Sequence, residues 1–267
     1  MTTVLSIAGS DSSAGAGIQQ DLKTITSLGC YGATVITAIT SQNTLGVQHV
    51  MPVPASVVKS QMKSVLSDLD VSAIKIGMIP NREVAEAVVE SLQKEFVVKS
   101  NNTSSPTGGV RGGLGAIVYD PVMISTSGRQ LMDEDCLGYV IENLVPLCTL
   151  ITPNMPEAAH LRKASPTLLR EGTGGAYLIK GGHAEGDEMT DTLYMPDGTI
   201  HRFTSPKIDT TNLHGTGCTL SSAIASYLAM GYTLPDAVGK AKETINKGIE
   251  GGRHLHIGSG NGPLWLF

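Results

Sequence analysis

The segment from Asp209 to Ala223 combines the residue types that bind an anion at the start of a helix. Its sequence, DTTNLHGTGCTLSSA, places Gly215, Thr216 and Gly217 before an apolar helical stretch. Glycines and small hydroxyl residues let successive backbone N–H groups face a phosphate, and the positive end of the helix dipole strengthens that attraction. We therefore predict a phosphate-binding anion hole at this helix start.

Cys218 follows the predicted anion hole and would lie on the first turn of the helix. A helix N-terminus lowers the pKa of a thiol below its free value of about 8.5, which would make Cys218 a proton acceptor or a nucleophile. A lone cysteine is more often a small buried apolar residue. The adjoining anion hole makes the catalytic interpretation the better one here.

A glycine- and serine-rich loop from Gly9 to Gly17 follows the first apolar run of the chain. Its small residues allow the backbone to approach a ligand, although a helix cap without a ligand is the plainer alternative. The loop does not match a GxGxxG dinucleotide fingerprint, because Gln20 occupies the third glycine position. A GxxxxGK(S/T) phosphate loop is absent from the sequence as well. Any nucleotide must therefore be held in another way.

Three further polar features follow apolar runs. The segment Ser41-Gln42-Asn43-Thr44 offers amide donors and acceptors together, as the edge of a heteroaromatic ring requires, and an ordinary polar turn is the alternative. In Thr152–Glu157, Pro156 suits the first turn of a helix, and Glu157 could reach a bound cation or simply offset the helix dipole. Lys180, followed by two glycines, could neutralise a transferring phosphate or be an ordinary surface lysine.

The elements that position these residues follow from an alternation of short apolar runs with longer amphipathic stretches, the pattern of a mainly parallel α/β sheet. We predict strands at 4–8, 31–40, 73–76, 116–120, 149–151 and 177–180, a hairpin from 192–195 and 200–203, helices at 18–28, 56–69 and 82–96, and two closing helices. The carboxyl ends of parallel strands share one edge, so the polar segments should converge there. Residues 99–115, polar and rich in glycine, are predicted to form a surface loop without core residues.

Composition narrows the function classes. The 267 residues are 41% hydrophobic and 16% charged with a net charge of −5, which indicates one globular domain over 1–267 and excludes the basic footprint of a nucleic-acid or anionic-membrane binder. No run of 18 apolar residues or basic leader is present, so we expect a cytosolic protein that acts on small molecules. The four cysteines lack a CxxC pair and are expected to be reduced thiols, without a disulfide or a zinc site.

Seven segments, taken together and in this order, resemble the bifunctional hydroxymethylpyrimidine/phosphomethylpyrimidine kinases of thiamine biosynthesis. They are AGSDSSAGAGIQQDLKT (8–24), ITAITSQNTLGV (36–47), IKIGM (74–78), YDPVM (119–123), TPNMPEA (152–158), IKGGH (179–183) and HGTGCTLSSAIA (214–225). The resemblance covers nearly the whole chain. It implies a ribokinase-like fold, an α/β three-layer sandwich with a central, mostly parallel sheet flanked by helices. It also implies two successive phosphoryl transfers from ATP with Mg²⁺, first to the hydroxymethyl oxygen of 4-amino-5-hydroxymethyl-2-methylpyrimidine and then to the resulting monophosphate.

The same resemblance implies roles for individual residues. Gln42 would hydrogen-bond the aminopyrimidine, in a pocket lined by Gly9, Asp11, Ala16, Met78 and Val122. Cys218 would accept the proton of the attacking hydroxyl, while the amides of Gly215, Thr216 and Gly217 stabilise the transferring phosphoryl group. The ATP phosphates and Mg²⁺ would be held by Asn154, Glu157, Asp120, Lys180 and Thr211, with Asp120 and Glu157 on the metal side.

Two other functions stay open on the sequence. Some pyridoxal or pyridoxine kinases share the scaffold and the cysteine of the anion hole, although Met78 and Gln42 favour the aminopyrimidine. A sensor that binds the pyrimidine without catalysis would need neither Cys218 nor Lys180, nor the pair Asn154 and Glu157. The family resemblance further implies a homodimer.

Overall fold

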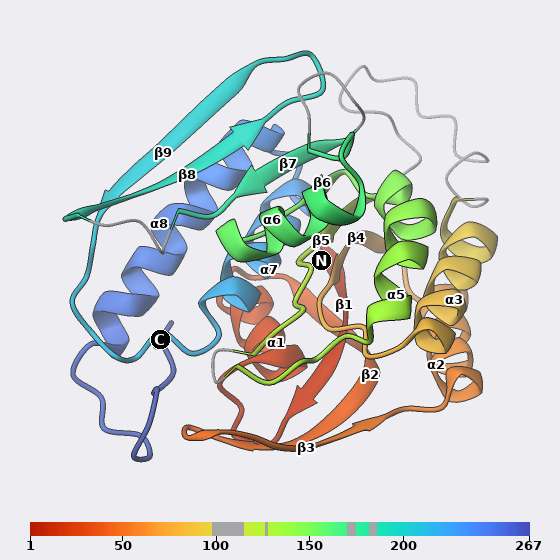
Figure 1. The fold of residues 1–267 in the computed structure, drawn as a ribbon, viewed down its shortest axis with the longest axis horizontal. Coiled ribbons are helices and arrows are strands. Elements are labelled where there is room, and N and C mark those ends of the chain that lie inside the picture. The colour runs from red at the N-terminus through yellow and green to blue at the C-terminus, as the bar shows by residue number, and fades with distance from the viewer. Residues whose placement is uncertain (98–114, 126–127, 170–174, 182–185) are drawn as a thin grey trace.

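Nine strands form one sheet in the computed structural model, which describes residues 1–97, 115–125, 128–169, 175–181 and 186–267 (Figure 1). The strand order is β3-β2-β1-β4-β5-β6-β7-β8-β9. Neighbouring strands from β2 to β7 are parallel, whereas β3, β8 and β9 pair antiparallel at the two edges. The strands are β1 (Thr3–Asp11), β2 (Tyr31–Asn43), β3 (Gly46–Pro52), β4 (Val71–Ile76), β5 (Ala116–Tyr119), β6 (Leu150–Ile151), β7 (Ala176–Ile179), β8 (Glu188–Tyr194) and β9 (Ile200–Pro206).

Helices cover both faces of this sheet, which gives three layers (Figure 1). One face packs against α2 (Ala55–Asp68), α3 (Arg82–Ser91), α5 (Glu134–Tyr139) and α6 (Met155–Ala164). The other face packs against α1 (Gly17–Ser27), α7 (Thr216–Ala229) and α8 (Leu234–Gly252). Short π-helical and 3₁₀ turns at Leu92–Val97, Val140–Leu144 and Val145–Leu147 extend α3 and α5. The three-layer α/β fold expected from the sequence is confirmed.

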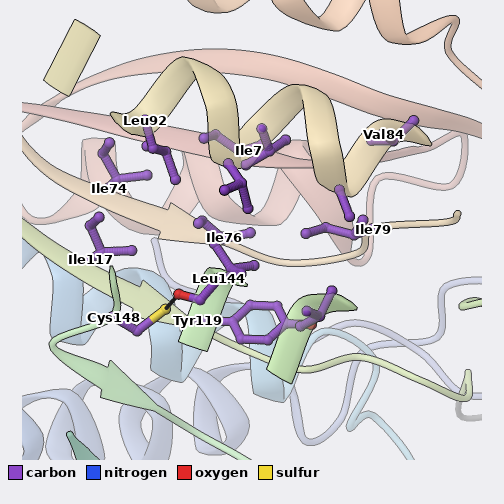
Figure 2. Close-up of a cluster of buried hydrophobic side chains, with 14 of the residues drawn as sticks. Ile7, Ile74, Ile76, Ile79, Val84, Leu92, Ile117, Tyr119, Leu144 and Cys148 are labelled. Carbon is purple, nitrogen blue, oxygen red and sulfur yellow. Dashed lines mark hydrogen bonds between the residues drawn. The ribbon is translucent and has the colours of Figure 1, made fainter. Parts of the chain in front are cut away.

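Successive side chains along β4 point alternately into the two apolar cores, one on each face of the sheet. Ile74 and Ile76 are fully buried in the core beneath α2 and α3, where Figure 2 shows them beside Ile7 of the neighbouring strand. Ala73 belongs to the core beneath α1, α7 and α8. Because successive strand residues point to opposite faces, Lys75 shares the face of Ala73 and points toward α1 and α7. Lys75 is fully buried there.

Most predicted elements lie within a few residues of the observed ones, and the differences concern the ends of strands. β1 continues to Asp11 and β2 to Asn43, so the pocket residues predicted to lie in turns lie at strand ends instead. The extension of β2 has a partner, because β3 pairs with it from Ala38 to Asn43. The sequence interpretation missed β3 and α5. Of the loop predicted at 99–115, all but Gly115 lies outside the described residues. In the described part of the chain, no helix combines the length and the apolar character needed to cross a membrane.

Candidate active site

The predicted anion hole lies at the start of α7. Gly215 caps the helix with a φ of +85°, a left-handed conformation that glycine adopts without strain. A side chain at this position would collide with the carbonyl oxygen of Gly15. Of the three amides predicted to bind the phosphoryl group, that of Thr216 instead donates to the carbonyl oxygen of Leu213 at 3.3 Å. Among the described residues, the backbone amides of Gly217 and of the following Cys218 have no hydrogen-bond acceptor. The first turn of α7 can therefore donate these N–H groups to an external anion.

A lysine and two carboxylates lie beyond the ends of β5, β6 and β7. Lys180 Nζ donates to Asp120 Oδ1 at 2.7 Å and lies 3.9 Å from Glu157 Oε2. Asp120 also accepts from Thr152 Oγ1 at 3.1 Å. Glu157 is placed by a capping box at the start of α6, in which its side chain and that of Asn154 each accept from the other residue's backbone N–H at 2.8 Å. Because β5, β6 and β7 are adjacent and parallel, the residues that follow them lie together at the carboxyl edge of the sheet, as predicted.

Burial perturbs the titration of this cluster. Burial raises the pKa of Glu157 to about 7, the charge of Lys180 opposes that rise, and the nearby Asp120 carboxylate adds to it. Burial alone would lower the pKa of Lys180, but Asp120 and Glu157 outweigh this effect and raise it above its usual value. The Lys180 ammonium is therefore held charged between two carboxylates.

The anion hole and the charged cluster face each other across Gly217. A Cβ atom built on Gly217 would lie 3.1 Å from Asp120 Oδ2 and 3.5 Å from Lys180 Nζ. Because Gly217 has no side chain, the helix start and these charged groups face each other directly. A phosphoryl group bound between them would contact backbone N–H groups on one side and Lys180 on the other.

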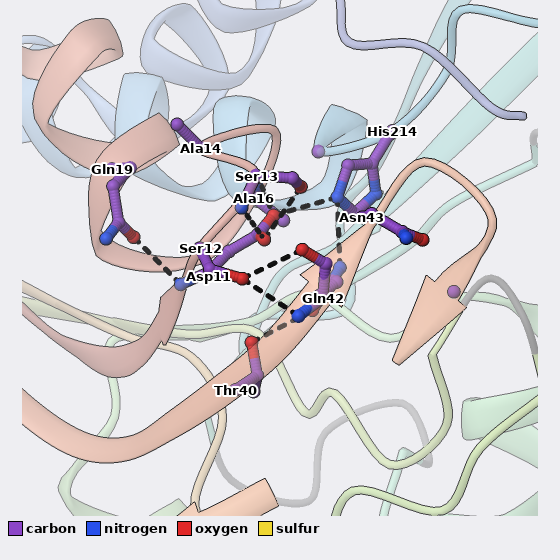
Figure 3. A network of polar contacts seen from close by, with 12 residues as sticks. Asp11, Ser12, Ser13, Ala14, Ala16, Gln19, Thr40, Gln42, Asn43 and His214 are labelled. Carbon is purple, nitrogen blue, oxygen red and sulfur yellow. Dashed lines mark hydrogen bonds and ion pairs between the residues drawn. The ribbon is translucent and has the colours of Figure 1, made fainter. Parts of the chain in front are cut away.

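A second polar group of residues lies at the ends of β1 and β2 (Figure 3). The carboxylate of Asp11 accepts from the backbone N–H groups of Ser13 and Ala16, each at 2.8 Å, and lies 2.9 Å from His214 Nε2. Burial would raise the pKa of Asp11, but the hydrogen bonds from His214 and Ser13 outweigh burial and lower it. Asp11 therefore stays ionised and fixes the shape of the glycine-rich loop.

His214 connects this loop to the predicted pyrimidine-binding glutamine. Its Nε2 atom lies 3.1 Å from Gln42 Nε2, while Gln42 Oε1 accepts from Thr40 Oγ1 at 3.2 Å (Figure 3). A small pocket beside this contact is lined by Gln42, His214 and residues of the β2–β3 turn. Because His214 immediately precedes Gly215, the glutamine contacts the residue next to the anion hole.

The structure brings together most, not all, of the pocket residues predicted from the resemblance. Gly9 lies against Met78, since a Cβ built on Gly9 would lie 3.0 Å from Met78 Sδ. Asp11 and Ala16 share the hydrogen bond described above. For Val122 and Thr211 the described contacts are backbone hydrogen bonds, to Asp120 and from Leu213, and none places them against the pyrimidine pocket or Lys180. Their predicted roles stay predictions.

The predicted low pKa of Cys218 is wrong. Burial raises the pKa of this thiol to about 11, and this effect exceeds the lowering by Lys75 and by the backbone amide of Gly17. Asp21 and Asp120 raise it further. The sequence showed the helix N-terminus but not the desolvation of the sulfur or the carboxylates around it, and desolvation favours the neutral thiol.

Sequence reasoning also left three residues of this region without a role, namely His214, Asp21 and Lys75. His214 was visible inside the HGTGC segment but had no assigned partner until the fold placed it against Asp11 and Gln42. Lys75 had a detectable signal, because a lysine inside the apolar run AIKI is out of place on a buried strand. The pairing of Lys75 with Asp21 required the three-dimensional structure.

An α/β sandwich that places a helix-start anion hole beside a buried lysine–carboxylate cluster, at the carboxyl edge of its sheet, defines a small-molecule kinase with a ribokinase-like fold. The sequence model of the phosphomethylpyrimidine kinase family matches residues 11–101 and 110–265. The chain belongs to this family.

Individual relatives agree with this assignment. The chain is 45% identical to a hydroxymethylpyrimidine/phosphomethylpyrimidine kinase of Rhizobium meliloti (strain 1021), over 100% of this chain and 98% of that protein. It is 38% identical to the enzyme of that name in Escherichia coli (strain K12), over 98% and 96% of the two chains. Two solved structures are also similar. The phosphomethylpyrimidine kinase of Clostridium difficile 630 is 37% identical with a TM-score of 0.74, covering 93% of this chain and 100% of that one. The pyridoxal kinase of Staphylococcus aureus with AMP-PCP and pyridoxal is 30% identical with a TM-score of 0.81, covering 99% and 93%.

Proposed function

We propose that this chain transfers the γ-phosphoryl group of ATP to the hydroxymethyl oxygen of 4-amino-5-hydroxymethyl-2-methylpyrimidine, and then a second one to the monophosphate. The observation that carries the proposal is the position of His214, which contacts Gln42 at 3.1 Å and is followed directly by the anion hole at Gly215–Gly217. A ring held by Gln42 would have its substituent beside that hole. The names of the relatives support this substrate, and membership of a kinase family argues against a non-catalytic sensor.

The roles of the site residues follow from charge. As the acceptor oxygen bonds to the γ-phosphorus, the bond from that phosphorus to the β–γ bridging oxygen breaks and ADP leaves. The amides of Gly217 and Cys218 and the Lys180 ammonium stabilise the charge spread over the transferring group. In the first transfer the hydroxyl proton passes to the sulfur of Cys218 in its thiolate form. In the second transfer the acceptor is a phosphate oxygen that is ionised at neutral pH, so no proton has to be removed.

The residues at the charged cluster fit a Mg²⁺ ion that accompanies ATP. Lys180 Nζ lies 2.7 Å from Asp120 Oδ1 and 3.9 Å from Glu157 Oε2, so two carboxylates share one ammonium group and can attract a further cation. Mg²⁺ prefers oxygen ligands and keeps waters and substrate phosphates in its shell. In the described part of the chain no cluster of three or more metal-ligating side chains is found, so Asp120 and Glu157 would share the ion with phosphate oxygens. The bound ion would neutralise phosphate charge.

The test is an assay of ADP release that compares three acceptors at equal concentration, namely the hydroxymethylpyrimidine, its monophosphate and pyridoxal. We expect turnover with both pyrimidines and at most weak turnover with pyridoxal. Replacement of Gln42 by alanine should raise the KM for the pyrimidine and leave the KM for ATP unchanged. Gln48→Ala is the matched control, because Gln48 lies on β3 and contacts Asn43 and Gly46 rather than His214.

Pyridoxal phosphorylation is the second candidate function, favoured by one observation. The backbone is at least as similar to the pyridoxal kinase of Staphylococcus aureus, with a TM-score of 0.81, as to the phosphomethylpyrimidine kinase of Clostridium difficile, with 0.74. Sequence identity favours the pyrimidine kinases, at 37% against 30% for the same pair. Equal or better turnover of pyridoxal in the assay above would overturn the choice of the pyrimidine.

We further propose that the chain forms a homodimer through the β2–β3 edge of the sheet. Ile39 and Met51 are cross-strand partners there, and 46% and 48% of their surfaces are exposed. Leu45, in the turn between the strands, is 68% exposed. Apolar side chains gathered at one exposed edge are typical of a protein interface. Light scattering of the wild type and of Met51→Glu tests this, with a monomeric wild type as the contrary result. The cytosolic location stays a prediction.

A further inference from the structure

A buried ion pair lies beneath the start of α7 and outside the set of residues assigned so far. Lys75 Nζ lies 2.8 Å from both carboxylate oxygens of Asp21, and the side chains of both residues are fully shielded from solvent. Taking two charges out of water costs about as much as their attraction returns, so replacement by apolar residues is often neutral or stabilising. Stability alone therefore gives no strong reason for charges at this place.

Hydrogen bonds connect the pair to the helix that carries the anion hole. Asp21 Oδ1 accepts from Ser222 Oγ of α7 at 2.8 Å, and Asp21 Oδ2 accepts from Ser6 Oγ of β1 at 2.6 Å. Ser222 follows Cys218 by four residues, so the two side chains lie on the same face of α7, one turn apart. The face of α7 that carries the Cys218 sulfur is therefore the face that rests on the ion pair.

The position of the Lys75 ammonium is fixed closely. It lies near the backbone of Gly77, where a built Cβ atom would come within 2.8 Å of Lys75 Nζ. Four charged groups act on Cys218, each from a different element or connection: Lys75 from β4, Asp21 from α1, Asp120 after β5 and Lys180 after β7. Lys180 forms an ion pair with Asp120 at 2.7 Å, and its proposed role is to stabilise the charge of the phosphoryl group. Lys75 is the cation that acts from beneath the helix.

We propose that Lys75 is a positioning residue for the first phosphoryl transfer: its ammonium, held in place by Asp21, supplies the positive charge that lets Cys218 reach the thiolate form and take the hydroxyl proton. This inference rests on the proposed role of Cys218. No bond to Lys75 forms or breaks, and it keeps its own proton throughout. Asp21 raises the pKa of Lys75 above its usual value despite burial, which keeps the ammonium charged at the neutral to mildly alkaline pH of the activity assays.

The experiment measures the charge of Cys218 without using turnover. Ionisation of Cys218 is followed by the ultraviolet absorbance of its thiolate as the pH is raised, after subtraction of the same titration of Cys218→Ser. The other three cysteines are buried and cancel in that subtraction. The variants are Lys75→Met and the double variant Asp21→Asn/Lys75→Met. The single variant leaves the Asp21 carboxylate buried without its partner and could fail to fold, whereas the double variant removes both charges. Lys242→Met and Asp191→Asn/Lys242→Met are the matched controls. That pair is also a buried lysine–aspartate contact, with Lys242 Nζ 2.7 Å from Asp191 Oδ2, but it joins α8 to β8 rather than β4 to α1.

We expect Lys75→Met to move Cys218 ionisation upward by about one pH unit and to lower kcat/KM for the hydroxymethylpyrimidine about tenfold at pH 8. The double variant also removes the Asp21 carboxylate, which raises the pKa of Cys218, so its upward shift should be smaller. Turnover of the monophosphate and the KM for ATP should change much less. The control variants should leave the thiolate titration at its wild-type position. An unchanged titration in a folded Lys75 variant overturns the inference. If Cys218→Ser keeps full activity while the Lys75 variants still shift the titration, the proposed role of Cys218 is wrong and the coupling of the two charges stands.

Discussion

The pH dependence of the first phosphoryl transfer should reveal the ionisation of Cys218. Burial raises the pKa of this thiol to about 11, so the thiol is the main form at neutral pH. If the thiolate accepts the hydroxyl proton, kcat/KM for the hydroxymethylpyrimidine must follow the thiolate fraction. That fraction rises about tenfold for each pH unit below the pKa, and at pH 8 it is about one in a thousand. Activity with the hydroxymethylpyrimidine should therefore rise with pH from neutral values toward pH 11.

The expected magnitude follows from these numbers. Between pH 8 and pH 10 the value of kcat/KM should rise about a hundredfold, with a slope close to one on a logarithmic plot. Cys218→Ala should remove the slope and lower the rate at pH 10 by roughly a hundredfold or more, the usual scale of a positioned base. The affinity for the pyrimidine should be largely kept, because Gln42 and Asp11 remain.

The assay is a measurement of ADP release at saturating MgATP, in buffers of matched ionic strength from pH 7 to pH 10. The second transfer is an internal control, because the monophosphate acceptor is already ionised in this range and its rate should not follow the thiolate. Cys30→Ala is the matched cysteine control, since Cys30 is buried in the core beneath α1, α7 and α8. A wild-type profile that is flat for the first acceptor, or a Cys218→Ala variant that keeps the slope, would refute the proton-acceptor role.

Three further outcomes follow from the site. Gly217→Ala should abolish turnover while the protein stays folded by circular dichroism. Its Cβ would lie 3.1 Å from Asp120 Oδ2 and 3.5 Å from Lys180 Nζ, between the helix start and the groups proposed to bind the phosphoryl group. Near-normal turnover would show that the phosphoryl group does not bind at this place. The Mg²⁺ concentration for half-maximal activity should rise about tenfold from pH 8 to pH 6, since the raised pKa of Glu157, about 7, means that a proton then competes with the ion; an equal requirement at both values would exclude Glu157 as a metal contact. Asn154→Ala should cost about 1 kcal/mol of unfolding free energy in a denaturant titration by breaking the capping box of α6, and an unchanged midpoint would contradict this.

The sequence was sufficient for the features that depend on local patterns. The apolar runs predicted the central strands, and the order of strand and helix predicted their convergence at one edge. The short apolar pattern failed at β3, where the side chains of Gly46–Pro52 are mostly exposed and no buried face marks a strand. It also failed at α5, a helix of six residues that is too short to show a helical period.

The candidate site was predictable where a residue acts through its own backbone or its neighbours in sequence. The start of α7 after Gly215 and the start of α6 near Pro156 are of this kind, whereas the anion-binding role of Gly215–Gly217 stays a prediction. The pKa of Cys218 is not, because it depends on burial and on charges contributed by three other elements. A helix dipole can be inferred from sequence, whereas desolvation depends on what covers the sulfur.

The start of α7 combines functions that would otherwise need separate elements. His214, just before the helix, contacts the glutamine predicted to hold the ring, and the first turn presents the free amides and Cys218. One turn later, Ser222 of α7 donates a hydrogen bond to Asp21 of α1. A shift of α7 would therefore change ring binding, phosphoryl stabilisation and the charge near the sulfur together. The polar layer formed by Ser222, Asp21 and Lys75 between helix and sheet fixes that position more narrowly than apolar contacts would, since hydrogen bonds are directional and apolar packing is not.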